Sequence, residues 1–370
     1  MNRSTILTVV LFCVTLYIPL SLYSQSQDFV IDGTVLVKYN GNAANVTIPA
    51  GVTAIRYYAF KDNRSITSVT IPKGVTAIGT SAFDGCSSLT SITIPSSVTS
   101  IGGSAFMGCS SLTGITIPSR VTSIEQNTFS GCTSLTSVTI PSSITSIGGR
   151  AFMGCSSLAS VTIPSGVTSI GSDAFMWCVN LTSITIPAGV TSIGKDPFVG
   201  NAWLDNLPNG LVYVGKVLYR YRGTMPANTV INNIRADTTE IADHAFREKR
   251  GLTSIIIPSS ITSIGDSAFY KCNSLTSITI PEGVTAIRAF TFYGCSSLTS
   301  ITIPASVTAI GVGAFYECNS LTSVTIPASV TAIGVGAFSK CGSLASITVS
   351  RKTTIGKDAF PDGVKITYSD

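Results

Sequence analysis

Charged residues are scarce in this sequence. Asp, Glu, Lys and Arg make up 11% of its 370 residues, whereas they make up about 25% of an average soluble protein. The basic residues are dispersed, and the densest run is only Arg247-Glu248-Lys249-Arg250. A nucleic-acid-binding surface needs a basic patch or stripe, so no nucleic acid is expected as a partner. Hydrophobic residues amount to 44%, which argues against a disordered chain.

Residues that catalyse reactions are also scarce. His244, beside Asp243, is the only histidine, and a Ser–His–Asp or Cys–His centre would have to use it. It falls at a variable position of the repeat described below, so we interpret it as a solvated loop residue. The sequence has no H-E-x-x-H, P-loop or dinucleotide-binding glycine motif. We expect no catalytic residues, no cofactor and no metal site, and a protein that is not an enzyme.

Residues 1–24 have the pattern of a signal peptide. Arg3 supplies the positive charge, an apolar stretch runs from Thr5 to Leu22, and polar residues follow from Ser24. The apolar stretch approaches the length that spans a bilayer, so an uncleaved anchor is the alternative. Pro19 and the polar exit favour cleavage near Ser24. We therefore expect a secreted or cell-surface protein that has no membrane span after cleavage.

The rest of the sequence is dominated by a 23-residue repeat. Phenylalanine keeps this step from Phe60 to Phe198 and again from Phe246 to Phe338, and Phe360 comes one residue early. Proline and cysteine share the same step. The cysteines are Cys86, Cys109, Cys132, Cys155 and Cys178, then Cys272, Cys295, Cys318 and Cys341. Three residue types with one period establish a repeat architecture.

One unit, residues 86–106, reads CSSLTSITIPSSVTSIGGSAF. Its L-x-x-I-x-I segment predicts a strand with Leu89, Ile92 and Ile94 facing inward. Pro95 ends this strand, because proline cannot donate to a sheet ladder. The following V-x-x-I-G segment gives a second apolar pair and then a turn at Gly102. Such a unit is too small to fold alone, but stacked units cover one another's apolar faces.

We therefore predict a mainly-β repeat solenoid of about a dozen units, roughly 60 Å long at the usual strand spacing. A parallel sheet would run along one side, with short strand and turn segments on the other. The nine cysteines after Cys13 lack C-x-x-C spacing. Neighbouring units lie farther apart than the roughly 3.8 Å between bridged Cβ atoms. We interpret these cysteines as a buried column of free thiols.

The pattern L-x-x-[IV]-x-I-P-x-x-[VI]-T-x-I-G-x-x-A-F-x-x-C resembles the BspA-like, or Treponema-type, leucine-rich repeat family. The resemblance covers residues 46–360 apart from one interruption. It implies a right-handed leucine-rich-repeat superhelix. It also implies an exported or surface protein of a host-associated bacterium, or of a protozoan, that adheres to host matrix or cell-surface proteins or to other microbial surfaces.

The repeat is interrupted between Phe198 and Phe246, which are 48 residues apart where two units would take 46. Asn201 takes the place of the cysteine. Residues 211–223 then share the frame G-x-V-L-x-[KR]-Y-x-G with residues 29–41, and both segments predict a hairpin that turns at the first glycine. We favour one continuous solenoid with a protruding hairpin, and a bend at the interruption is the alternative.

The chain is thus divided into five parts. The signal peptide (1–24) precedes an N-terminal capping hairpin (25–45) and a first repeat cassette (46–204). An interrupting hairpin (205–235) leads to a second cassette (236–370), whose residues 364–370 form a closing strand. The hairpin at 25–45 would cover the open end of the stack, because exposed strand edges promote aggregation.

Ligand contacts are expected where units differ, since solenoids bind along extended surfaces. The outward threonines from Thr70 to Thr325 hardly vary, and we interpret them as a solvated sheet surface; a hydroxyl array for glycan or ice is the alternative. The position after each Phe varies more, and the interrupting hairpin is basic. The candidate contacts are Lys216, Tyr219, Arg220, Tyr221, Arg222, Arg247, Tyr270, Tyr293 and Tyr316.

Together these features predict a non-enzymatic, exported binding protein that mediates adhesion. A structural surface-coat component without a specific ligand is the alternative.

Overall fold

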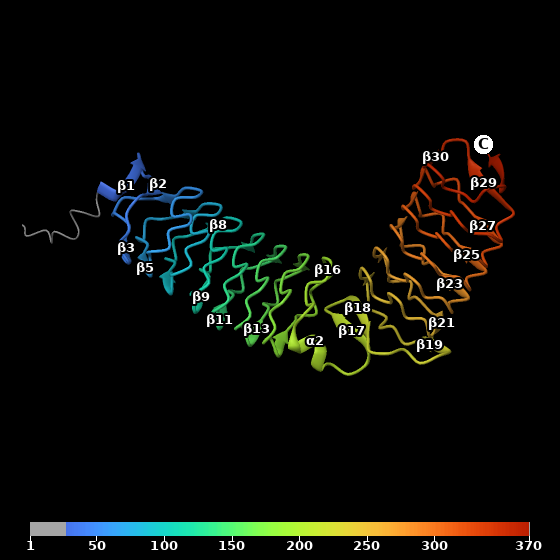
Figure 1. The fold of residues 1–370 in the computed structure, drawn as a ribbon, viewed down its shortest axis with the longest axis horizontal. Coiled ribbons are helices and arrows are strands. Elements are labelled where there is room, and N and C mark those ends of the chain that lie inside the picture. The colour runs from blue at the N-terminus through green and yellow to red at the C-terminus, as the bar shows by residue number, and fades with distance from the viewer. Residues whose placement is uncertain (1–26, 370) are drawn as a thin grey trace, which may run out of the picture.

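The computed structural model describes residues 27–369, so the expected signal peptide at 1–24 lies outside it. The chain winds into a mainly-β solenoid of about 15 turns (Figure 1). Each turn contributes two short strands that pair with their equivalents in neighbouring turns. In the described part, no helix has the length and apolar character needed to cross a membrane. The predicted fold class is confirmed.

The first strand of each unit builds the predicted parallel sheet along one side. The pairing joins residues 23 apart, such as Val69 and Ile92, and the threonines expected to face outward are exposed. In the first cassette these strands are β3 (Asn45–Thr47), β5 (Ser68–Thr70), β7 (Ser91–Thr93), β9 (Gly114–Thr116), β11 (Ser137–Thr139), β13 (Ser160–Thr162) and β15 (Ser183–Thr185). In the second they are β19 (Thr229–Ile231), β21 (Leu252–Ile255), β23 (Ser277–Thr279), β25 (Ser300–Thr302), β27 (Ser323–Thr325), β29 (Ser346–Ser350) and β31 (Lys365–Ser369).

A second parallel sheet runs along another side and contains the strands that precede the glycine of the repeat. Ile78 pairs with Ile101, for example. In the first cassette these strands are β4 (Ala54–Ile55), β6 (Ala77–Ile78), β8 (Ser100–Ile101), β10 (Ser123–Ile124), β12 (Ser146–Ile147), β14 (Ser169–Ile170) and β16 (Ser192–Ile193). In the second they are β20 (Glu240–Ile241), β22 (Ser263–Ile264), β24 (Ala286–Ile287), β26 (Ala309–Ile310), β28 (Ala332–Ile333) and β30 (Thr354–Ile355).

Both predicted hairpins form, and each joins the second sheet. At the N-terminal end, β1 (Phe29–Asp32) and β2 (Val35–Tyr39) are antiparallel, and β2 pairs with β4. This hairpin covers the open edge of that sheet, as expected. At the interruption, the short helix α2 (Ala202–Asn206) leads to β17 (Gly210–Val214) and β18 (Val217–Arg222), and β18 pairs with β20. The predicted closing strand is β31, which pairs with β29.

The interrupting hairpin does not protrude, contrary to our expectation. Strand β18 takes the place of one turn of the stack, because two of its adjacent residues, Leu218 and Tyr219, are buried. Tyr219 packs in the core of the first cassette, and Leu218 packs in the core of the second. The stack therefore continues through the interruption, and it changes direction there (Figure 1). We call this region the junction.

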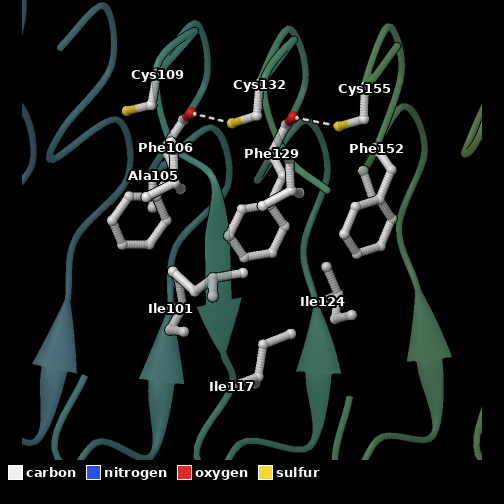
Figure 2. Close-up of a cluster of buried hydrophobic side chains, with 14 of the residues drawn as sticks. Ile101, Ala105, Phe106, Cys109, Ile117, Ile124, Phe129, Cys132, Phe152 and Cys155 are labelled. Atoms are coloured by element: carbon white, nitrogen blue, oxygen red, sulfur yellow. Dashed lines mark hydrogen bonds between the residues drawn. The ribbon is translucent and has the colours of Figure 1, made fainter. Parts of the chain in front are cut away.

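The core consists of columns of equivalent side chains. The phenylalanine rings from Phe60 to Phe198 stack with centroids 4.7–5.7 Å apart, and the column resumes from Phe246 to Phe360 at 4.9–5.8 Å. Figure 2 shows three of these rings. At the junction, the Tyr219 ring packs edge-on against Phe198, with centroids 5.7 Å apart. Tyr219 thus replaces the missing phenylalanine contact.

The nine cysteines form the predicted column of buried, free thiols. Each Sγ donates to the carbonyl of the phenylalanine 26 residues earlier, as Cys132 does to Phe106 at 3.2 Å (Figure 2). Asn201 does occupy the cysteine place, and its Nδ2 donates to the Phe175 carbonyl at 2.7 Å. The column satisfies one buried carbonyl in each unit, which would otherwise cost about 1–3 kcal/mol.

The repeated glycine has a different role from the one we predicted. Gly102 is outside the left-handed region, so its turn does not require glycine. A Cβ on Gly102 would instead lie 2.5 Å from the backbone nitrogen of Thr80 in the preceding unit. The glycine allows close approach of two backbones, and its own nitrogen donates to the Ile78 carbonyl at 2.8 Å.

The second sheet divides at two of the units that lack this glycine, although it continues through the units that have Arg56 and Ala242 at this position. Glu125 and Arg288 occupy the glycine position, and the sheet is broken between β8 and β10 and between β22 and β24. In both units a threonine replaces the following alanine. The hydroxyls of Thr128 and Thr291 donate to the Glu125 and Arg288 carbonyls, each at 2.8 Å. These bonds stabilise the turns of the two units.

We expect Gly102→Ala to lower the free energy of unfolding by about 1–3 kcal/mol, because the new methyl group overlaps the neighbouring backbone. Urea unfolding of a chain that starts at Gln25 measures this. Gly342→Ala is the matched control, since a Cβ there meets nothing within 4 Å and Gly342 has no positive φ. The control should be neutral or slightly stabilising. Equal losses in the two variants would contradict the close-approach role.

We expect iodoacetamide to label none of the nine cysteines in the native chain that starts at Gln25. Their burial excludes the reagent, and it raises the pKa of Cys86, Cys132 and Cys272 to about 12, so the reactive thiolate is suppressed. In guanidinium chloride without reductant, all nine should be labelled, as mass spectrometry would show. Protection of eight would instead indicate four disulfides.

Candidate binding site

Three tyrosines form a ladder on the outside of the second cassette. Tyr270, Tyr293 and Tyr316 each follow a core phenylalanine, and their rings stack with centroids 4.8 and 4.9 Å apart. We call them the tyrosine ladder. Because the rings stack face to face at 12–16°, they expose mainly their edges and hydroxyl groups. At the ends, Arg247 lies 4.8 Å above the Tyr270 ring and Lys340 lies 5.0 Å above the Tyr316 ring.

A hollow of about 440 Å³ lies at the junction, next to the ladder. Three distant chain segments line it: the turn after β16, the end of β18, and the turn after β20. We call it the junction hollow, and its lining residues are Lys195, Asp196, Arg220, Tyr221, His244, Arg247 and Lys249. Arg247 belongs to both features, so the hollow and the ladder are continuous.

Positive charge dominates the junction hollow. Four Lys and Arg side chains surround one carboxylate, that of Asp196. Asp196 Oδ1 lies 3.1 Å from Arg220 Nη2, and Oδ2 lies 3.8 Å from His244 Nδ1. The His244 contact, followed by the charge of Arg220, lowers the pKa of Asp196 despite its partial burial. Burial, followed by the charge of Arg220, lowers the pKa of Lys249.

Charged side chains beside the ladder occupy strained backbone positions. Two residues per unit adopt the left-handed conformation, one before and one after the phenylalanine. After the phenylalanine, four successive units of the first cassette have glycine: Gly85, Gly108, Gly131 and Gly154. The second cassette has Glu248, Lys271, Glu317 and Lys340 there, with φ of 52–61°, and glycine only at Gly294. Such residues cost about 1–3 kcal/mol each, and they concentrate at functional sites.

The structure brings six of the nine predicted contact residues together. Arg220, Tyr221 and Arg247 line the hollow, and the other three form the ladder. Tyr219 was a wrong prediction: it is 1% exposed and packs in the core. Arg222 stays a prediction: it does not line the hollow, and its guanidinium donates to the carbonyls of Asp205 and Leu207 and so holds the chain after α2. Lys216, at the turn of the hairpin, does not line the hollow.

His244 is not the solvated residue that we expected. Its side chain is 18% exposed and faces Asp196 in the hollow. The sequence reasoning also missed Lys195 and Asp196. Their signal in the sequence was weak: Lys195 and Asp196 occupy the repeat positions that Gly103 and Ser104 occupy in an earlier unit. Only the fold places them within reach of residues 220–249.

Two other hollows have no charged groups. These hollows, of about 450 and 360 Å³, lie on the outward face of the first sheet, where the sheet is broken between β11 and β13 and between β7 and β9. Their linings hold no charged side chain. In the part of the chain described, no group of three or more His, Cys, Asp or Glu residues could hold a metal ion. The junction hollow and the ladder are therefore suited to binding through charges, hydroxyl groups and ring edges.

The repeat that builds this site also defines its family. The profile of the BspA type leucine rich repeat region matches residues 37–148, 99–219 and 239–367, which together make up most of the chain. The chain belongs to the BspA-type leucine-rich repeat family. The gap between the last two matches, residues 220–238, falls at the junction, where the family's repeat gives way to the hairpin.

Several solved structures of leucine-rich repeat proteins resemble this family member. A leucine rich cell surface protein from Faecalibacterium prausnitzii is 37% identical; the match covers 87% of this chain and 92% of that protein, with a TM-score of 0.48. A leucine-rich repeat protein from Bacteroides ovatus is 26% identical over 93% of this chain and 100% of that one, with a TM-score of 0.45. A comparison with curated proteins finds no match.

We expect Asp196→Asn to lower the free energy of unfolding by about 1–3 kcal/mol at pH 7, because Arg220 loses its charged partner in a partly buried site. The folded-state pKa of Asp196 is lowered, so its contribution is full above the ordinary Asp pKa of about 3.9 and is lost as pH falls below it. Urea unfolding at pH 7 and pH 3 should show a difference that shrinks in acid.

The control is Asp237→Asn, which removes the carboxylate of the exposed Arg235–Asp237 pair nearby. Such surface pairs contribute little, so this variant should match the unmodified protein. A loss at Asp237 as large as that at Asp196 would contradict the special role of the hollow.

Proposed function

We propose that this family member is a non-enzymatic, secreted or cell-surface protein whose role is adhesion to host matrix or cell-surface proteins, or to other microbial surfaces. Three features support this proposal. The chain is a repeat solenoid of the BspA type. Its 37% identical relative is described as a leucine rich cell surface protein. Residues 1–24 have the pattern of a signal peptide.

The observation that carries the proposal is the tyrosine ladder beside the junction hollow. Stacking does not require these residues, because the first cassette stacks equally well with Met107, Ser130 and Met153 at the ladder position. The second cassette instead places tyrosines there and charged side chains on strained backbone next to them. Aromatic and arginine side chains are typical of the residues that contribute most to binding.

The second candidate function is a structural surface coat, which the uniform outward threonines favour. Saturable binding separates the two functions. We expect the chain that starts at Gln25 to bind saturably to at least one of a panel of immobilised matrix proteins, such as fibronectin and fibrinogen, or to cultured host cells. Absence of saturable binding to every member of the panel would favour the coat.

We further expect the double variant Arg247→Gln/Tyr293→Leu to bind about tenfold more weakly, equivalent to about 1.4 kcal/mol. The variant removes one charge and one hydroxyl but keeps the apolar area of the ladder. Lys73→Gln/Met153→Leu changes an exposed charge and a ladder-equivalent residue in the first cassette, and it should bind normally. Unchanged affinity in the first variant, with its melting temperature retained, would remove the site from the proposal.

A further inference from the structure

The junction hollow is part of a longer positive stripe. A second hollow of about 430 Å³ adjoins it, shares Arg247 and Lys249, and adds Arg250 to the lining. It also adds one carboxylate, that of Glu248, which lies 3.7 Å from Arg247, so cations still outnumber anions along the stripe. The same residue, Arg247, also connects both hollows to the tyrosine ladder, because it lies over the Tyr270 ring. The stripe therefore crosses several units along the axis of the solenoid. A small anion would occupy only one part of it, whereas an extended polyanion would contact all of it.

The backbone beside the ladder is not available to a ligand. The amides of Glu248, Lys271 and Gly294 donate to the carbonyls of Tyr270, Tyr293 and Tyr316 at 2.6–2.7 Å. Peptides are commonly held by an open strand edge, by a groove for an amphipathic helix or by an aromatic groove for polyproline. The ladder has no open edge, and both hollows are shallow surfaces of mixed charge. Recognition here depends on side chains alone.

The ring faces of the ladder are not available either. Each ring covers its neighbour, and Arg247 and Lys340 cover the ends. Bases of single-stranded nucleic acid need exposed aromatic faces to stack on, so the ladder does not suit them. The exposed groups are ring edges, which are electropositive, and hydroxyl groups. In the described structure, the hydroxyls of Tyr270 and Tyr293 make no hydrogen bond within the protein, so they can bond to a ligand.

The geometry points to an acidic polysaccharide, one that carries sulfate or carboxylate groups, as the ligand of this stripe. Its anionic groups would pair with Arg247, Lys249 and the other cations of the junction hollow. Its sugar hydroxyls would bond to the phenol groups of the ladder. The alcohol groups of a polysaccharide both donate and accept, so they can bond to phenol hydroxyls without the backbone pairing or groove on which peptide recognition commonly depends. This inference rests on the proposed binding function and specifies its ligand class.

The test is a binding titration of the chain that starts at Gln25 with chondroitin sulfate, neutral dextran of equal length and poly-L-glutamate. We expect saturable binding of chondroitin sulfate, which weakens as salt screens the charges, and no binding of dextran. Arg247→Gln/Lys249→Gln should lower the affinity at least tenfold. Tyr293→Leu should lower the affinity while leaving its salt dependence unchanged.

The matched control is Lys73→Gln/Arg120→Gln, which removes two exposed charges from the first cassette and should change the affinity less than twofold. Equal losses in both double variants would mean non-specific attraction and would overturn the inference. Poly-L-glutamate that binds as tightly, and with the same dependence on the variants, would assign the stripe to acidic proteins.

The two proposals fail in different ways. If matrix proteins or cells bind through the stripe but chondroitin sulfate does not, the polysaccharide is wrong and the adhesive function stands. If chondroitin sulfate binds through the stripe but no matrix protein or cell does, the ligand class stands and the adhesive role is wrong. If nothing binds saturably, both are wrong.

Discussion

Direct stacking of equivalent residues is the constraint on which the rest of this structure depends. Every residue in a regular unit lies on its counterpart 23 positions away, as the pairing of Ile78 with Ile101 illustrates. Three repeated contacts maintain this arrangement: a glycine that admits the neighbouring backbone, a thiol that bonds to a neighbouring carbonyl, and a phenylalanine that stacks on a neighbouring ring. These contacts explain why glycine, cysteine and phenylalanine share one period.

The same constraint accounts for the scarcity of charge. Like charges placed directly opposite on adjacent strands are destabilising, so a column of one sign is disfavoured in a stack. Some neighbouring charges in a column have opposite signs and pair, as Arg150 does with Asp173 and Lys340 does with Glu317. Like-charged neighbours are few: Asp173 lies next to Asp196, and Asp243 lies next to Asp266. A concentration of positive charge therefore needs a place where the units are not strictly equivalent.

The junction is such a place. The hairpin strand β18 replaces a regular turn, and segments on both sides of it bring their cations to one hollow around Asp196. The regular units before and after it remain rigid supports for this site. Similar but smaller departures occur where Glu125 and Arg288 replace glycine and the second sheet is broken. Regular units thus supply the scaffold and the tyrosine ladder, and the junction supplies the concentration of charged groups.

The sequence by itself determined the stack, the inward residues of each unit, the column of free thiols, both hairpins and the tyrosine ladder. All of these follow from periodicity, because the period identifies which residues must be neighbours. Only the tertiary structure decided that Tyr219 is buried, that Arg222 holds the chain after α2, and that His244 faces Asp196. These residues lie at the interruption, where no repeat assigns neighbours. Their side-chain directions depend on how β18 packs between two cores.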